Sequence, residues 1–350
     1  MPSAASLGTS ATDWVASLSP WPEEFGLDRM RALLTRLGDP QTKYPAIHVV
    51  GSNGKSTATR TIAGLLSAEG LNAGAYTSPH VSGWHERLDC DPATFERAVT
   101  RVRSEAESLG ATQFEVLTAA ALLEFAEAGV DAAVVEAGLG GRLDATNVVD
   151  AEVVLLTNVA LEHTDVLGET IEQIAKEKLA VAHTARVVVT SDNIFANLLP
   201  PAARVVHGGA REAAEAFLGR RVESDITVSL PGRFQRRGDE IWDGAHTPEA
   251  ADWLAERLPA RDYVLCVSIL ADKRVGALLD RLARVGRTLV ATSSSNPRAL
   301  SADDVAAQAG GRFDHVEAIA DPQEALARAR VLGKRVLVTG SLYLLADLHQ

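Results

Sequence analysis

The chain has 350 residues, 46% of them hydrophobic, and a formal net charge of -12 at pH 7. This length and apolar content are typical of a globular protein with two domains. The acidic balance argues against nucleic acid as a partner, because non-specific binding to that polyanion rests on Lys and Arg displacing counterions. The chain lacks a signal-peptide pattern and the roughly 18 uninterrupted apolar residues of a membrane span, so we expect a cytoplasmic protein without a membrane partner.

The predicted elements alternate between strand and helix along the first two thirds of the chain. Strand-like runs span residues 46–50, 71–76, 131–138, 152–158 and 185–191, and helical apolar spacing is clearest over residues 114–129. This alternation predicts an α/β fold with a mostly parallel sheet covered by helices. Cys90 and Cys266 have no metal-like spacing and are expected to be packed thiols.

The alternation of strand and helix begins again after about residue 230. Further strand-like runs span residues 240–246, 263–270, 288–294, 313–319 and 334–340. The sequence LPGRFQRRG, residues 230–238, is rich in breakers and charge and separates the two halves. We therefore expect one domain over residues 1–230, with a loose tail at 1–15, and a smaller α/β domain over residues 231–350.

The stretch GSNGKST, residues 51–57, lies between the strand 46–50 and a predicted helix that begins near Ser56. Glycines let backbone N–H groups converge on phosphate oxygens, the helix N-terminus adds partial positive charge, and Lys55 adds a full one. The Ser56 hydroxyl stands where it could reach a magnesium ion on the phosphates. Val49 occupies the position of the first glycine of a strict P-loop, so a plain glycine turn with a solvated lysine is the alternative.

Chemically reactive side chains follow three further predicted strands. The loop 77–89 gathers Ser78 with two histidines, Glu136 ends the strand 131–138, and His163 and Lys178 follow the strand 152–158. In an open α/β sheet these strand ends meet at one edge, where a magnesium ligand would lie close to the phosphate cradle. Taken singly, His163 could be a turn histidine, Glu136 a salt-bridge partner and Lys178 a solvated helix residue. Their succession favours one shared site.

These residues resemble a known family. The segments GSNGKST, TSPH, TQFE, VVEAGLGGRLDATNV, LEHTDVLG, LPGRFQ, DGAH and TGSLY occur in the order seen in folylpolyglutamate synthases and bifunctional dihydrofolate synthases, members of the Mur ligase superfamily. The resemblance runs from about residue 20 to 345, and GLGGRLDATN is its most specific part. It implies an ATP-dependent amide ligase with an N-terminal P-loop domain and a C-terminal Rossmann-like domain.

The resemblance also implies roles for individual residues. It places Ser52, Asn53, Gly54 and Lys55 on the ATP phosphates and makes Ser78, Glu136 and His163 ligands of magnesium. Lys178 is similar to a lysine that carries a carbamate, whose negative charge would hold a second magnesium ion. In the second domain, Arg233 and Asp243 resemble nucleotide contacts and His246 lies near the reacting centre.

The family's substrates are a folate, L-glutamate and MgATP. The residues that match its folate-contacting segments are Thr112, Gln113, Phe114 and Glu115, then Leu143, Asp144 and Ala145, and with poorer agreement Pro22–Phe25. A carboxylate does not react with an amine at neutral pH, so ATP first converts it to an acyl phosphate, which the amine of glutamate then attacks. We expect the domains to close about LPGRFQ and exclude water from that intermediate, and we expect a monomer.

The chain departs from the family pattern in four places. Ser56 and Thr247 replace a usual glycine and asparagine, and Glu162 replaces the aspartate of the family's LDH. The segment between residues 191 and 230 is short and lacks an asparagine-led motif that contacts ATP in relatives. The alternatives are therefore a Mur-type ligase for another carboxylate or amino acid, and a P-loop protein that only hydrolyses ATP.

Overall fold

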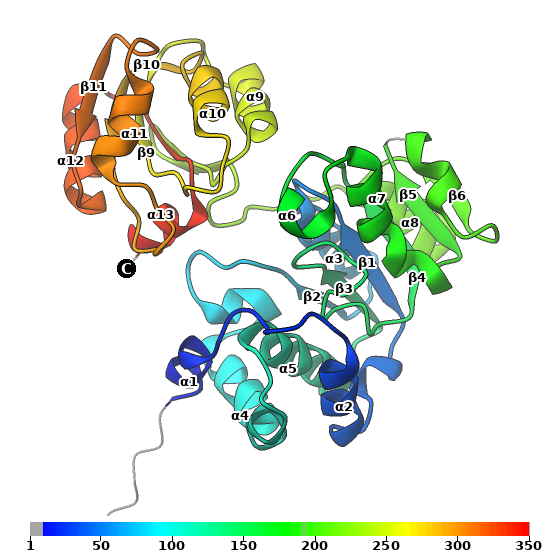
Figure 1. The fold of residues 1–350 in the computed structure, drawn as a ribbon. Helices are drawn as coiled ribbons and strands as arrows, with labels where there is room; N and C mark the ends of the chain where they lie inside the picture. The colour runs from blue at the N-terminus through cyan, green and yellow to red at the C-terminus, as the bar shows by residue number, and fades with distance from the viewer. Residues whose placement is uncertain (1–9, 192, 350) are drawn as a thin grey trace, which may run out of the picture. The chain divides into compact units, whose positions relative to one another are not determined.

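The computed structural model describes residues 10–191 and 193–349 and divides the chain into two compact units. The first unit comprises residues up to 79 and 84–228, and the second comprises residues 80–83 and 229–350. Each unit contains its own six-stranded sheet with helices around it (Figure 1), which confirms the expected α/β class. Among the described residues, no helix combines the length and apolar character that crossing a membrane requires.

The first sheet is entirely parallel, in the order β2-β3-β1-β4-β5-β6. Its strands are β1 (Ala46–Val50), β2 (Ala73–Tyr76), β3 (Ala132–Glu136), β4 (Ala151–Leu156), β5 (Val187–Thr190) and β6 (Arg204–His207). The three central strands are buried almost throughout, which explains their continuous apolar runs. β1 lies between β3 and β4, so the loop that follows β1 emerges in the middle of the carboxyl edge.

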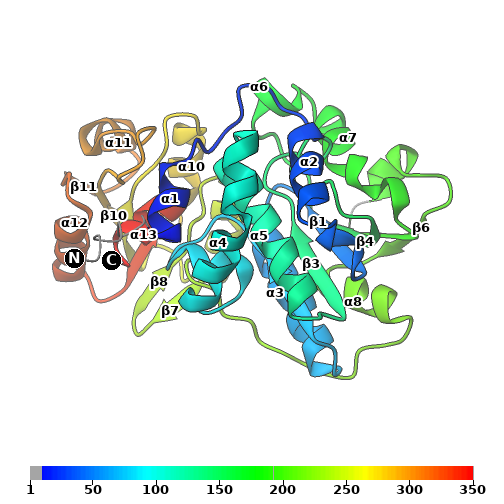
Figure 2. The same cartoon turned by 90° about the horizontal axis from the view of Figure 1, so that it is seen from below.

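The helices of the first unit are placed on both faces of its sheet (Figure 2). They are α1 (Ala11–Ser17), α2 (Asp28–Arg36), α3 (Lys55–Ala68), α4 (Pro92–Leu109), α5 (Gln113–Glu127), α6 (Thr164–Leu167), α7 (Ile171–Leu179) and α8 (Ala210–Leu218), with 3-10 turns η1 (Pro40–Thr42), η2 (Trp84–Leu88), η3 (Ala180–Thr184) and η4 (Asn193–Leu198). One core packs α3 and α8 against one face. On the other face, α1, α2, α4 and α5 share a core with β1 and β3, and α7 and η3 pack against β4 and β5.

Residues 11–15, expected within a loose tail, begin α1, whereas residues 1–9 lie outside the described part of the chain. Ser10 caps α1 by accepting from the Asp13 amide, and the Glu96 carboxylate of α4 accepts from the amides of Ala11 and Thr12. Trp14 and Val15 are buried in the core with α4 and α5. A capping side chain at Ser10 and an apolar face explain why these residues are ordered.

The second unit has the sheet order β11-β10-β9-β12-β8-β7, parallel except for the β7–β8 hairpin. Its elements are β7 (Gln235–Arg237), β8 (Glu240–Trp242), α9 (Pro248–Arg257), β9 (Tyr263–Val267), α10 (Val275–Leu282), β10 (Gly286–Ala291), α11 (Ala302–Ala309), β11 (His315–Ala318), α12 (Pro322–Leu332), β12 (Val336–Thr339) and α13 (Leu342–Asp347). Helices on both faces bury β9, with Leu265 in one core and Cys266 in the other.

Candidate active site

The loop after β1 is held open by the two residues that follow β4. Thr157 donates through Oγ1 to the Asn53 carbonyl at 2.8 Å, and Asn158 accepts from the Asn53 amide at 2.9 Å. A Cβ on Gly51 would lie 1.9 Å from Thr157 Oγ1, so only glycine fits there. Gly54 has φ 78° at the start of α3, a conformation that glycine adopts without strain. The backbone of the loop is thus fixed by the residues after β4, in the arrangement expected of a phosphate cradle.

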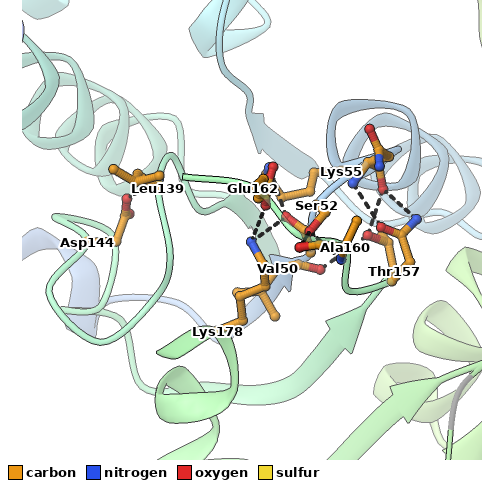
Figure 3. Close-up of polar contacts among 12 residues, drawn as sticks. Val50, Ser52, Lys55, Leu139, Asp144, Thr157, Ala160, Glu162 and Lys178 are labelled. Carbon is orange, nitrogen blue, oxygen red and sulfur yellow. Dashed lines mark hydrogen bonds and ion pairs between the residues drawn. The ribbon is translucent and has the colours of Figure 1, made fainter. Parts of the chain in front are cut away.

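Two lysines meet at the base of this cradle. Lys55 Nζ and Lys178 Nζ each donate to the Gly51 carbonyl at 3.0 Å, and Lys178 also pairs with Glu162 at 2.7 Å (Figure 3). The Lys178 side chain is 2% exposed, at the end of α7. Burial, and then the charge of Lys55, lower the pKa of Lys178 to about 8. Lys178 is therefore a buried amine beside the cradle, not a solvated helix lysine.

Glu162 is the acidic partner of Lys178 and also feels the charge of Lys55. Burial opposes ionisation of its carboxyl, but the charges of Lys178 and Lys55 prevail and lower its pKa to about 2. Ala160, two residues earlier, donates its amide to Ser52 Oγ at 3.0 Å, which ties this segment to the cradle. His163 follows Glu162 in the left-handed conformation (φ 45°) and stands at the N-terminus of α6.

Three of the residues expected around magnesium lie together at the end of β3. Glu136 is 2% exposed and accepts from the Ser56 hydroxyl at 3.1 Å and from the Ser78 amide at 3.0 Å. Ser78 precedes Pro79 through a cis peptide bond. Carboxylate and hydroxyl oxygens are ligands that magnesium prefers. Within residues 10–191 and 193–349, no three His, Cys, Asp or Glu side chains gather into a metal-binding group.

The glycine-rich loop 138–145 packs against the end of α7 that carries Lys178. A Cβ on Gly141 would lie 2.6 Å from the carbonyl oxygens of both Glu177 and Lys178, and the Arg142 amide donates to the Glu177 carbonyl at 2.9 Å. Asp144 is buried within the same loop and accepts from the Leu139 amide at 2.8 Å (Figure 3). Burial raises the pKa of Asp144. The Asp144 side chain therefore holds two parts of this loop together.

The segment Thr112–Glu115 begins α5 and reaches the glycine-rich loop through one ring. A Cβ on Gly138 would lie 2.6 Å from the Phe114 ring, so loop and ring are in close contact. Thr112 and Glu115 form a capping box, and the Arg29 guanidinium donates to Glu115 at 2.8 Å. Gln113 donates to the Val15 carbonyl at 2.9 Å. Most polar atoms of this segment thus serve the fold, which leaves Phe114 as its contribution to the loop.

The remaining residues predicted to contact folate lie either in the glycine-rich loop or in an exposed segment near the N-terminus. Leu143 and Ala145 flank Asp144 in the glycine-rich loop, and Ala145 is buried in the core with α5. Trp21 precedes the segment Pro22–Phe25, and Phe25 is its last residue. Their ring centroids lie 6.3 Å apart, and the two residues are 50% and 45% exposed. Two exposed aromatic rings this close give the first unit an apolar patch at that segment.

The predicted residues of the second unit form a loop of their own. Asp243 is half-buried and accepts from the amides of Phe234 at 2.7 Å and Ala245 at 2.8 Å, and desolvation raises the pKa of its carboxyl. His246 lies 2.9 Å through Nδ1 from the Gly244 carbonyl. Arg233 Nη1 lies 3.4 Å from the Gly232 carbonyl. Asp243 therefore brings the LPGRFQ and DGAH segments together within this unit.

Sequence reasoning missed four residues that shape the site. Thr157 and Asn158 position the cradle, Glu162 pairs with Lys178, and Arg29 pairs with Glu115. The polar pair Thr157-Asn158 at the end of a buried strand was the available signal, because side chains at that position reach the neighbouring strand's loop. No signal in the sequence pointed to Arg29, since its partner Glu115 lies 86 positions away.

A parallel sheet with a phosphate cradle, joined to a second α/β unit, defines the class of two-domain, ATP-dependent Mur-type ligases. The Mur ligase middle domain model matches residues 49–230, and the Mur ligase, glutamate ligase domain model matches residues 232–342. The chain belongs to the Mur ligase family and, within it, to the folylpolyglutamate synthase/dihydrofolate synthase family, as the following relatives show.

Two relatives and two solved structures illustrate the similarity. The chain is 33% identical to folylpolyglutamate synthase of Lacticaseibacillus casei, over 92% of this chain and 93% of that one. It is 31% identical to dihydrofolate synthase/folylpolyglutamate synthase of Mycobacterium tuberculosis, over 84% and 80%.

Folylpolyglutamate synthase of Mycobacterium tuberculosis complexed with ADP superposes with a TM-score of 0.86 at 29% identity, covering 96% of each chain. A bifunctional folylpolyglutamate synthase/dihydrofolate synthase with Mn, AMPPNP and L-glutamate bound gives 0.82 at 26% identity, covering 97% of each. These findings confirm the resemblance found in the sequence motifs, and they support a ligase that uses ATP and a divalent metal.

Proposed function

We propose that this chain adds L-glutamate to the terminal carboxylate of a folate through an acyl phosphate, as a folylpolyglutamate synthase that also serves as a dihydrofolate synthase. The observation that carries the proposal is the meeting of Lys55 and Lys178 at the Gly51 carbonyl, together with the buried carboxylate of Glu136 that accepts from Ser56, the residue after Lys55. The relatives named above favour this substrate pair over another carboxylate or amino acid. The reaction takes place in the cytoplasm and is carried out by a monomer.

The cradle residues act first by binding and orienting ATP. Amides of the loop 51–54 and the N-terminus of α3 receive the phosphates, and Lys55 leaves the Gly51 carbonyl to pair with the β- and γ-phosphates. Negative charge accumulates as the folate carboxylate attacks the γ-phosphorus, and Lys55 neutralises part of it. In the second unit, Arg233, Asp243 and His246 serve the nucleotide and the incoming glutamate.

The donors at the end of β3 fit a divalent ion. Ser78 and Glu136 would hold one magnesium ion with the Ser56 hydroxyl beside them, and His163, at the N-terminus of α6, would complete the set of ligands. Magnesium bound there supplies positive charge against the phosphate oxygens. The folate lies along Phe114 and the loop residues 143–145, with Thr112, Gln113 and Glu115 fixing the end of α5 that presents the ring.

Lys178 carries a carbamate in the active protein. The ammonium first loses a proton to water, and the neutral amine then attacks the carbon of dissolved carbon dioxide. An N–C bond forms while one C–O π bond breaks and its electron pair moves to oxygen, and the nitrogen releases a second proton, so the cation has become an anion. Burial to 2% exposure and a pKa lowered to about 8 supply the neutral amine that this step needs. The anion would hold a second magnesium ion and would no longer repel Lys55.

Phosphate release measures the proposed reaction directly. We expect release to require a folate, L-glutamate, ATP and magnesium together, and the folate product to gain one glutamyl residue by mass spectrometry. Lys55→Ala should abolish release, whereas Lys43→Ala, at an exposed position before β1, should not. Release that depends on another acid and amine pair, or on ATP alone, would contradict the proposal.

A further inference from the structure

His48 is a fully buried histidine at the centre of the first sheet, and nothing in the reaction described above uses it. It lies in β1, paired in register with Val135 of β3 and Val154 of β4. Side chains alternate along a strand, so His48 shares the sheet face opposite to that of Ile47 and Val49, which pack in the core with α3. Its Nε2 lies 2.8 Å from Thr146 Oγ1, just after the glycine-rich loop.

The direction of the protons in this contact follows from the chemistry of its neighbours. The Thr146 hydroxyl has a single proton, which it donates to Asp144 Oδ1. The hydroxyl must therefore accept from His48, which fixes the Nε2–H tautomer. Nδ1 has no hydrogen-bond partner among the described residues, so a second ring proton would be buried unpaired. Burial, followed by the charge of His183, lowers the pKa of His48 to about 3 and keeps the ring neutral.

The carboxylate at the end of this chain of hydrogen bonds closes the glycine-rich loop. Asp144 Oδ2 accepts from the Leu139 amide at 2.8 Å and Oδ1 from the Thr146 amide at 3.0 Å, so it joins both ends of the segment 138–146. The middle of that segment abuts α7, because a Cβ on Gly141 would lie 2.6 Å from the Lys178 carbonyl. An interaction that fixes this loop therefore also fixes the end of α7.

We propose that His48 is a positioning residue that orients the Thr146 hydroxyl toward Asp144 and so anchors the loop 138–146 to the sheet. The anchored loop holds the main chain at Lys178 and presents residues 143–145 to the substrate. This second step rests on the proposed function, whereas the anchoring does not.

Three substitutions at one position separate hydrogen bonding from size. Glutamine places an amide N–H near the position of Nε2, asparagine places one near Nδ1, and leucine fills the space without a donor. We expect amide hydrogen exchange of the segment 138–147 to be at least tenfold faster in His48→Leu and His48→Asn, and within twofold of wild type in His48→Gln. The segment 51–56, held from Thr157 and Asn158, should exchange as in wild type.

Thr146→Val tests the same contact from its other side and remains available if His48→Leu does not fold. It should accelerate exchange in the segment 138–147 as His48→Leu does, and the double substitution should add little. His207→Leu, at an exposed position of β6, serves as the control and should change nothing. Unchanged exchange in His48→Leu, or equal exchange in the leucine and glutamine variants, would overturn the proposal.

Steady-state kinetics then connect the anchor to the reaction. We expect His48→Leu to lower kcat roughly 10- to 100-fold with the KM for ATP within twofold of wild type, and His48→Gln to restore kcat. An equal loss of kcat in all three variants would overturn the positioning role. If exchange responds as expected while folate and glutamate are not ligated, the proposed function fails and the anchor stands.

Discussion

Because the amine of Lys178 is buried, the free energy of unfolding should depend on pH between about 8 and 10.5. The folded state holds the pKa of Lys178 at about 8, against an ordinary value of 10.5, because of burial and the charge of Lys55. Between these two values the unfolded chain binds more protons at this lysine than the folded chain does. The free energy of unfolding therefore rises as pH rises from about 8 to 10.5, falls again as pH returns from 10.5 to about 8, and is unaffected by Lys178 below that range.

The size of this effect follows from the same two values. Each pH unit corresponds to about 1.36 kcal/mol, so the interval from about 8 to 10.5 amounts to roughly 3 kcal/mol. In buffers free of carbon dioxide, the unfolding free energy of wild type minus that of Lys178→Met should rise by about this amount across the window. Lys176→Met changes an exposed lysine of the same helix and should show no such rise.

Denaturant unfolding at a series of pH values measures these differences. Addition of bicarbonate near pH 8 should stabilise wild type and leave Lys178→Met unaffected, because the carbamate forms only where the amine is present. A difference between wild type and Lys178→Met that stays flat from pH 8 to 10.5 would refute the buried, depressed amine. Equal effects of bicarbonate on both proteins would refute the carbamate.

Three further predictions address the cradle, the metal and the loop. Lys55→Ala should lower kcat/KM by the equivalent of roughly 3 kcal/mol or more while the thermal midpoint changes little, and near-normal turnover would remove Lys55 from the phosphates. Glu136→Ala and His163→Ala should each raise the magnesium concentration needed for half-maximal rate, with little added by the double substitution; strict additivity at unchanged metal dependence would assign them separate structural roles. Gly141→Ala should destabilise the fold by about 1 to 3 kcal/mol and reduce ligation, because its Cβ would lie 2.6 Å from two carbonyl oxygens, and Gly26→Ala, with nothing within 4 Å, is the matched control; equal stability of the two variants would contradict that packing.

Most of the first sheet could be predicted because its strands are buried on both sides. The run 46–50 matches β1 at both ends, and the runs 131–138 and 152–158 contain β3 and all of β4 except its first residue. β6 was not predicted, since Arg204–His207 is a largely exposed edge strand without a continuous apolar run. The hairpin strand β7, Gln235–Arg237, falls in the charged stretch assigned to the link between domains, where composition favours a loop.

The candidate site was predicted as residue types at strand ends, but not as a network of contacts. Glu136 and Lys55 could be located from spacing, because the ends of parallel strands share one edge of the sheet. Thr157 and Asn158 can be noticed as a polar pair at a strand end, but their partner Asn53, 105 positions away from Asn158, cannot be assigned from a local pattern. The pair of Glu162 and Lys178 joins a loop to a helix 16 positions later, and no regular spacing marks it. The role of His48 was not predicted for a different reason: a histidine in an apolar strand is compatible with an ordinary core position.

Two lysine side chains at one carbonyl make the loop 51–54 suited to a polyanion. Lys55 and Lys178 both donate to Gly51, so two ammonium groups meet at a single dipole, with Glu162 as the acidic group that pairs with Lys178. Like charges this close favour any change that removes one of them. Phosphate oxygens would draw Lys55 away from the carbonyl, and a carbamate would reverse the charge of Lys178. Both changes relieve the same repulsion, so that relief is gained only once, and through this term alone nucleotide binding and carbamate formation should each weaken the other.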